Sequence, residues 1–374
     1  MSEYQYYEWQ TVDRLLTSKE QSEVSGLSSH IEVSSSRALV TYNWGGFKHD
    51  PKKVLLKYFD AHFYMANWGT RHLMFRFPHG LLNETEIESY RVQDFLEYES
   101  VGEYDVLEIR YDPEGEWCDS EGSLSDFIEL RADILNGDYR LLYLVWLKSL
   151  EWYGSEDESG PDSPAFDHEP PVPPGLKELT PGLEAFRMIF GVDRYVLQAA
   201  AENSPTRKLA AQPAYAELVH RLPREECDEF LTWLANGEAN LTPLLRKRLA
   251  AFLPPVDRPQ SAPPRTVGEL LRRARQIKVE EGDRQAQAAH QKYLAEMESL
   301  AARQEKIWQE IGRALESGKT AKVYDEVTAS LANLERLAEF QNTQPAFLAR
   351  LRPLIQKYSS RPSLIGRWHE RGWV

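Results

Sequence analysis

Cysteine is almost missing from this chain: of its 374 residues only Cys118 and Cys227 carry a thiol. Two thiols cannot build the disulfide framework of a small secreted domain, and they are too few for a zinc site made mainly of thiolates. The nine histidines include no HExxH pair, and no Cys-x-x-Cys occurs. The sequence therefore predicts neither a bound metal nor a cofactor.

Long apolar runs are missing as well. The most apolar segment, 141–147, has seven residues, whereas a helix that spans a membrane needs about 20. The first residues contain no basic stretch followed by an apolar one, which a secretory signal requires. We therefore expect a cytoplasmic protein that does not insert into a membrane and whose cysteines are reduced.

The motifs of several enzyme classes do not occur. The chain has no Gly-x-Ser-x-Gly, no Walker A sequence and no Gly-x-Gly-x-x-Gly, which weakens the case for a hydrolase, a nucleoside triphosphatase or a dinucleotide enzyme. The strand signature of RNA-recognition domains is missing too. An enzyme whose site is assembled from distant residues stays open.

The formal charge of −14 is unevenly distributed. Residues 1–180 carry −19 and residues 181–374 carry +5, which sum to −14. An overall negative charge opposes non-specific binding of the whole chain to nucleic acid or anionic lipid. The asymmetry indicates parts that have different partners or attract each other, or an acidic surface that serves solubility.

Two proline-rich stretches divide the chain. The first, 154–175, is also acidic, and the second is 254–265. Such segments bury too little apolar surface to offset their chain entropy, and proline keeps them extended. They predict linkers between three pieces: 1–153, 176–253 and 266–374.

The first piece shows the period-two pattern of half-buried strands. Alternation of apolar and polar residues occurs at 37–44, 70–77 and 105–111, an aromatic-rich strand fits 4–11, and helices fit 17–28, 123–136 and 138–152. We predict an α+β N-terminal domain: a mixed or antiparallel sheet with helices on one face, whose core the 138–152 helix closes.

A further helix is predicted over 51–66. Asp50 is a good N-cap, Pro51 suits the first helical position, and Gly69 can end the segment. Most of the helix surface is apolar, so we expect the helix to be buried. His62 falls on its buried face, where a hydrogen-bonded core histidine is more typical than a catalytic base.

The remaining two pieces are predicted to be all-α. Four short helices fit 176–253. In 266–374, a capping box begins at Thr266, and apolar residues step by three and four on both sides of Gly318. This pattern predicts a long antiparallel helical hairpin, with Gly282 as the place where the first arm could break.

Asn-Trp-Gly occurs twice, at 43–45 and 67–69. One interpretation is a pair of aromatic platforms that stack a base or a sugar. The other, which we favour, is that each marks the end of a strand or helix, with glycine in the turn and tryptophan covering the core edge. YNWGGFKHDP followed by NWGTRHLMFRFP resembles a pattern from uncharacterised bacterial proteins over about residues 37–78, which implies no activity and no site residue.

Three basic side chains form a possible anion-binding or ligand face on the first piece. His72 and Arg76 share the outward side of the predicted strand 70–77, and Arg110 lies on the predicted strand 105–111. Cations that converge on one face can hold an anionic ligand. If the protein is an enzyme, these three residues are the first to test.

The C-terminal segment 345–374 carries six basic residues and one acidic residue. Arginine interleaved with tryptophan can bind RNA or single-stranded DNA by phosphate contact and stacking. The alternatives are docking on the acidic front domain, or tryptophans that simply pack. The possible partner or nucleic-acid contacts are Arg272, Arg273, Arg275, Arg367, Trp368, Arg371 and Trp373.

The sequence thus favours a cytoplasmic interaction or adaptor protein without enzymatic activity, whose partner is another protein. The first alternative is a nucleic-acid-associated accessory protein that uses the basic C-terminal segment. The second is an enzyme with a site on the sheet face of the N-terminal domain.

Overall fold

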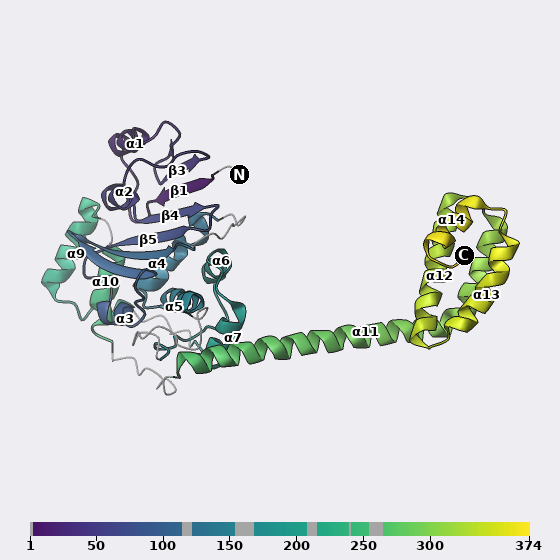
Figure 1. Ribbon diagram of the computed structural model, residues 1–374. Coiled ribbons are helices and arrows are strands. Elements are labelled where there is room, and N and C mark those ends of the chain that lie inside the picture. The colour runs from purple at the N-terminus through teal and green to yellow at the C-terminus, as the bar shows by residue number, and fades with distance from the viewer. Residues whose placement is uncertain (1–2, 114–121, 154–167, 208–214, 239–240, 254–264) are drawn as a thin grey trace. The chain divides into compact units, whose positions relative to one another are not determined.

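The computed structural model in Figure 1 describes residues 3–113, 122–153, 168–207, 215–238, 241–253 and 265–374. Its contacts divide the chain into two compact units, residues 1–278 and 279–374. We call them the sheet unit and the bundle unit. The sheet unit is α+β and the bundle unit is all-α, which confirms the predicted fold class. In the part of the chain described, no helix is both long and apolar enough to cross a membrane.

Seven strands form one sheet in the order β2-β3-β1-β4-β5-β7-β6, and every neighbouring pair is antiparallel. The four predicted strands correspond to β1, β3, β5 and β7. The bounds are β1 (Gln5–Gln10), β2 (Glu32–Val33), β3 (Arg37–Tyr42), β4 (Ala61–Ala66), β5 (Arg71–Pro78), β6 (Leu96–Val101) and β7 (Tyr104–Tyr111).

The predicted helix over 51–66 is wrong in its second half. Asp50 caps α2 as predicted, but α2 (Pro51–Tyr58) ends two turns early and β4 follows it. All six residues of β4 are buried, so the strand lacks the alternation that would reveal it. Asp60 fixes the change of direction, because its carboxylate accepts hydrogen bonds from the Val12 N–H at 2.7 Å and from Arg76 at 2.7 Å.

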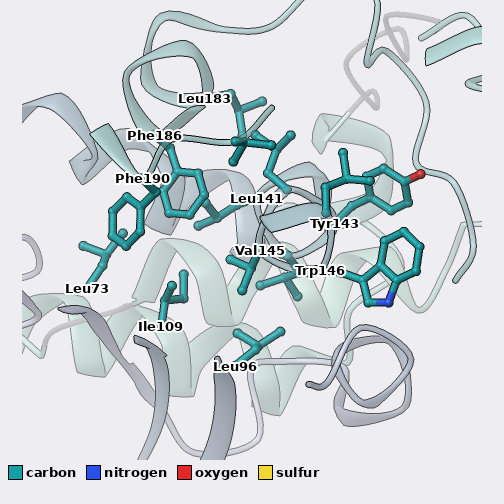
Figure 2. Close-up of a cluster of buried hydrophobic side chains, with 14 of the residues drawn as sticks. Leu73, Leu96, Ile109, Leu141, Tyr143, Val145, Trp146, Leu183, Phe186 and Phe190 are labelled. Atoms are coloured by element: carbon teal, nitrogen blue, oxygen red, sulfur yellow. The ribbon is translucent and has the colours of Figure 1, made fainter. Parts of the chain in front are cut away.

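The larger core lies between one sheet face and the helices that cover it, and Figure 2 shows part of it. Leu73, Leu96 and Ile109 of the sheet meet Val145 of α5 and Phe186 of α6. The 138–152 helix therefore closes the core as predicted. The elements on this side are η1 (Leu124–Asp126), α4 (Ile128–Leu135), α5 (Arg140–Tyr153), α6 (Pro181–Ile189) and α7 (Arg194–Glu202).

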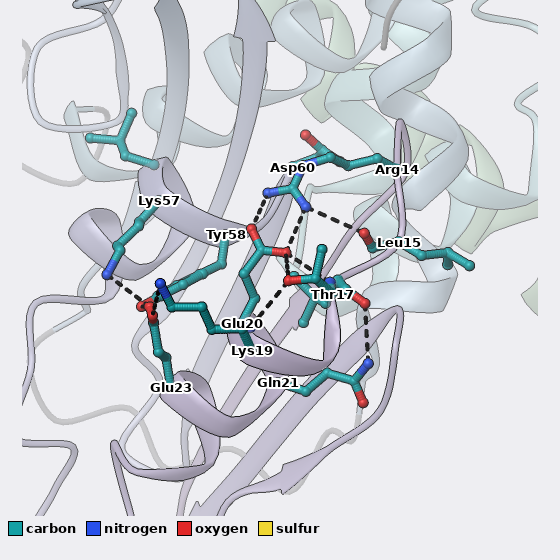
Figure 3. Close-up of polar contacts among 12 residues, drawn as sticks. Arg14, Leu15, Thr17, Lys19, Glu20, Gln21, Glu23, Lys57, Tyr58 and Asp60 are labelled. Carbon is teal, nitrogen blue, oxygen red and sulfur yellow. Dashed lines mark hydrogen bonds and ion pairs between the residues drawn. The ribbon is translucent and has the colours of Figure 1, made fainter. Parts of the chain in front are cut away.

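Helices cover the other sheet face as well, which the sequence did not predict. Here α2 and α1 (Ser18–Ser25) pack over a smaller core that includes Trp9 and Phe59. Figure 3 shows how α1 is held: Thr17 and Glu20 form a capping box, and Tyr58 of α2 donates to Glu23 at 2.7 Å. The hydrogen bond from Arg14 lowers the pKa of Glu20 to about 2.

The described ends of the two proline-rich stretches lie side by side. His168 and Thr266 form an antiparallel bridge, and the Glu169 N–H donates to the Arg265 carbonyl at 2.9 Å. The Arg265 guanidinium donates twice to the buried Glu169 carboxylate, at 2.6 and 2.9 Å, and the Tyr143 hydroxyl donates to it too. This cluster attaches the start of the long helix to α5 inside the sheet unit.

The remaining helices of the sheet unit are α3 (Glu84–Glu88), α8 (Tyr215–Val219), α9 (Arg224–Asn236) and α10 (Leu241–Ala250). The last three share a small core of their own around Leu218, Leu222 and Leu249. Residues 176–201, by contrast, contribute to the same core as the sheet.

The helix α11 (Val267–Ser317) is unbroken over 51 residues. The break that the sequence allows at Gly282 does not occur. Residues 282–292 are all exposed, and they include no large apolar side chain. A helix segment that is polar on every side buries no face of its own and is surrounded by solvent.

In the bundle unit, α12 (Ala321–Phe340), α13 (Gln344–Lys357) and α14 (Pro362–Glu370) pack with the C-terminal part of α11 (Figure 1). The Tyr293 and Phe340 rings lie 5.9 Å apart, and Arg336 pairs with Glu296 at 3.5 Å. These contacts run in opposite chain directions, which confirms the antiparallel helical hairpin.

Candidate binding surface at the tryptophan corners

The two Asn-Trp-Gly segments occupy equivalent places on the two sides of β1. Gln5, the first residue of β1, is opposite Tyr42 of β3 and also opposite Ala66 of β4. Each partner is followed directly by Asn-Trp-Gly. Because neighbouring strands lie about 4.8 Å apart, the two segments start about 10 Å from each other. We call 43–45 and 67–69 the tryptophan corners.

Each corner is held by a buried side chain that donates to the carbonyl oxygen of its glycine. The Gln5 amide donates to Gly45, and the Arg71 guanidinium donates to Gly69 at 2.7 Å. Both glycines have positive φ, 73° and 97°, a conformation that strains other residues. The corners are therefore fixed turns rather than loose loop tips.

Two tyrosines of the smaller core fix the orientation of the Gln5 amide. The hydroxyls of Tyr7 and Tyr64 donate to its amide oxygen at 2.8 and 3.4 Å, so its NH₂ group points at Gly45. Burial raises the pKa of both tyrosines above 10, which keeps both hydroxyls protonated as donors. Their rings lie 4.5 Å apart and form part of the smaller core.

Both tryptophans are exposed to solvent, Trp44 far more than Trp68. The exposed fraction is 76% for Trp44 and 36% for Trp68, so Trp44 does not cover the core edge as expected. Neither indole N–H donates a hydrogen bond to any described residue. Tryptophan is the largest aromatic side chain and a frequent anchor in interfaces, where the ring is buried and the N–H finds an acceptor. Two such rings on fixed turns form a surface suited to binding.

The candidate anion-binding residues are only partly brought together. His72 and Arg110 lie opposite each other on β5 and β7, near the corner end of the sheet, while Arg76 lies farther along β5. Each has an acidic partner, which reduces the positive charge left for a ligand. His72 is 3.2 Å from Asp112 and lowers the pKa of that carboxyl; Arg110 donates to Glu108 at 2.6 Å, and Arg76 to Asp60 at 2.7 Å.

The residues proposed to contact nucleic acid or a partner lie in both units. In the sheet unit, Arg272 and Arg275 are exposed and Arg273 pairs with Glu202 at 2.7 Å. In the bundle unit, Arg367 pairs with Asp325 at 2.6 Å and Arg371 is exposed.

The two C-terminal indoles are part of the bundle core. Trp368 is fully buried, and Trp373 is 8% exposed and donates to Glu335 at 2.6 Å. Both therefore pack as the third interpretation of this segment expects. A base could stack on the Trp368 ring only if the bundle opened.

The chain matches no protein-family model, no curated protein and no solved structure. The tryptophan corners are thus interpreted from their geometry alone. No group of three or more possible metal ligands occurs in the part of the chain that the structure describes. Sequence reasoning missed Gln5 and Arg71, which hold the corners, although the repeated Asn-Trp-Gly pointed to their location.

Proposed function

We propose that the protein is a non-enzymatic interaction protein, an adaptor whose sheet unit binds another protein through the two tryptophan corners. The observation that supports this most is the pair of exposed indoles that follow equivalent positions on the two sides of β1. Fixed turns lose little conformational entropy when they bind, so the burial of their rings contributes more of its free energy to affinity.

The organisation of the chain agrees with an adaptor. The sheet unit and the bundle unit each have a hydrophobic core of their own. The continuous helix α11 contributes residues to both, and its segment 282–292 is exposed. Separate cores allow the two units to carry separate recognition surfaces on one cytoplasmic chain.

Nucleic-acid binding is the second proposal, supported by the exposed Arg272 and Arg275 near the start of α11 and by Arg371 in the bundle unit. It predicts affinity for single strands that falls steeply as salt concentration rises. A role for His72 and Arg110 in an enzyme site also stays a prediction, testable by their replacement once a substrate is found.

The adaptor proposal is tested by affinity purification with quantitative mass spectrometry. The tagged wild-type chain is compared with the double variant W44A/W68A and with L15A. Leu15 is a matched control because it is apolar, 65% exposed and beyond the opposite end of β1. We expect protein partners that the wild type and L15A recover equally and the double variant loses. A set of recovered proteins that is the same for all three chains would contradict the proposal.

A further inference from the structure

We propose that the tryptophan corners bind a proline-rich peptide segment with basic residues, held in the polyproline II conformation. This inference rests on the proposed function, because it names the chemistry of the partner that the corners would recognise. It follows from the spacing of the corners, from the hydrogen-bonding groups they present and from the charge around them.

The spacing favours a polyproline II ligand. The corners start on strands β3 and β4, which are separated only by β1 and hence lie about 10 Å apart. A polyproline II helix rises about 3.1 Å per residue with three residues per turn, so residues i and i+3 share a face and are about 9.3 Å apart. A β-strand ligand would present same-face residues at about 7 or 13 Å. One proline per corner therefore fits the separation of the two strands from which the corners start.

The hydrogen-bonding groups fit as well. A polyproline II segment makes no internal hydrogen bonds, so its carbonyl oxygens are free to accept. The indole N–H of Trp44 and that of Trp68 donate to no described residue. Each ring can therefore pack against a proline ring while its N–H donates to a neighbouring carbonyl. The fixed φ of proline lowers the entropy lost on binding.

The charge of the surroundings selects basic flanks. The exposed carboxylates of Glu3 and Asp112 lie at the corner end of the sheet. Of the cations nearby, Arg110 is paired with Glu108 and Arg71 is buried, while Lys48 beyond the first corner is exposed. Lysine or arginine beside the prolines would meet the Glu3 and Asp112 carboxylates favourably, whereas these carboxylates would repel the phosphates of a nucleic acid.

The experiment measures fluorescence anisotropy of a labelled decaproline flanked by two arginines at each end, titrated with the purified full chain at low and physiological salt. We expect micromolar affinity, weakened at least tenfold by W44A and by W68A separately, and unchanged in L15A. Decaproline flanked by glutamates should bind at least fivefold more weakly. Circular dichroism checks that each variant is folded, and W44F should retain part of the affinity.

Three results would overturn the inference. The first is peptide binding that is equal in the wild type and in W44A/W68A. The second is no binding of the arginine-flanked peptide. The third is tryptophan-dependent binding of an oligosaccharide, a single-stranded oligonucleotide or an amphipathic helical peptide in its place. If the purification still yields partners that depend on both tryptophans, the adaptor function stands and only the ligand class is wrong. If neither experiment shows such dependence, both proposals fail.

Discussion

Tryptophan plays opposite parts in two regions of this molecule. At the corner end of the sheet, Trp44 and Trp68 are exposed on turns whose backbone accepts hydrogen bonds from buried side chains. In the bundle unit, Trp368 and Trp373 lie in the core with Leu364 and Phe347. The sequence favoured the reverse for Trp44, as cover for the core edge, and raised nucleic-acid contact for the C-terminal pair.

The difference shows that the neighbouring sequence, more than the residue type, determines whether a tryptophan is buried or exposed. Trp368 follows Leu364 by one helical turn, and the two lie on the apolar face of α14. The arginines beside Trp368 suggested contact with nucleic acid, but Arg367 forms an ion pair with Asp325 inside the bundle unit. Trp44 and Trp68 each precede a glycine in a turn, where no periodic apolar face continues into the core.

The largest expected effect is the loss of stability when a tryptophan of the bundle core is removed. Trp368→Ala removes a fully buried ring and leaves a cavity, and should destabilise the bundle unit by about 3–5 kcal/mol. Hydrogen exchange of the full chain should show faster exchange in α12 to α14, with the sheet amides unchanged. Sheet amides that lose protection to the same extent would mean that the two units unfold together.

Acid should act on the sheet unit, at the end of β4 away from the corners, rather than on the bundle. Burial lowers the pKa of His62 from its ordinary 6.5 to about 3; its Nδ1–H donates to the Glu8 carbonyl at 2.9 Å. Between these values only the unfolded chain binds the proton, so stability is lost as pH falls from about 6.5 towards 3. From pH 7 to pH 5 the loss is about 2 kcal/mol.

The check is urea unfolding followed at pH 7 and pH 5. His62→Phe, or His62→Gln if the first variant does not fold, should reduce the dependence on pH by about that amount. A variant whose stability falls as steeply as that of the wild type would show that the histidine is not the acid-sensitive group.

Replacing a glycine by alanine should lower the free energy of unfolding in a corner and raise it in the long helix. Gly45→Ala meets no neighbouring atom but forces alanine to φ 73°, which costs about 1 kcal/mol. Gly282→Ala in the exposed part of α11 also meets no atom, and it should stabilise by about 0.5–1 kcal/mol because alanine favours the helix. Thermal unfolding measures both, and the same sign for the two would contradict the fixed-turn description.

The smallest effect on stability is expected for the most exposed ring. Trp44→Ala should change the free energy of unfolding by less than about 0.5 kcal/mol, because the side chain is 76% exposed. The same change should weaken peptide binding at least tenfold. A destabilisation as large as that of Trp368→Ala would show that Trp44 is structural.

Much of the fold could be predicted because its signals are local. The alternation of β3, β5 and β7, the cap at Asp50 and the heptad-like steps of α12 each come from neighbouring residues. The strand β4 was missed because both of its faces are buried, so its pattern resembles that of a buried helix. His62 was correctly predicted to be buried, but in the wrong element.

The site could be predicted only as a repeated motif. No local sequence pattern indicates that β1 pairs with both β3 and β4. This pairing and its register place the two corners next to each other. The donors that hold them, Gln5 and Arg71, are ordinary polar residues in strands. Long-range pairing of strands therefore defines the surface, and a single sequence does not reveal it.

The most direct test of the corners as a binding surface is an NMR titration of the full chain, labelled with ¹⁵N at its ten tryptophans, with the arginine-flanked decaproline. Single tryptophan replacements assign the indole N–H signals. We predict that the Trp44 and Trp68 signals shift together and saturate at one peptide concentration, while those of Trp368 and Trp373 stay unchanged. Shifts confined to the C-terminal tryptophans, or none at Trp44 and Trp68, would contradict the account.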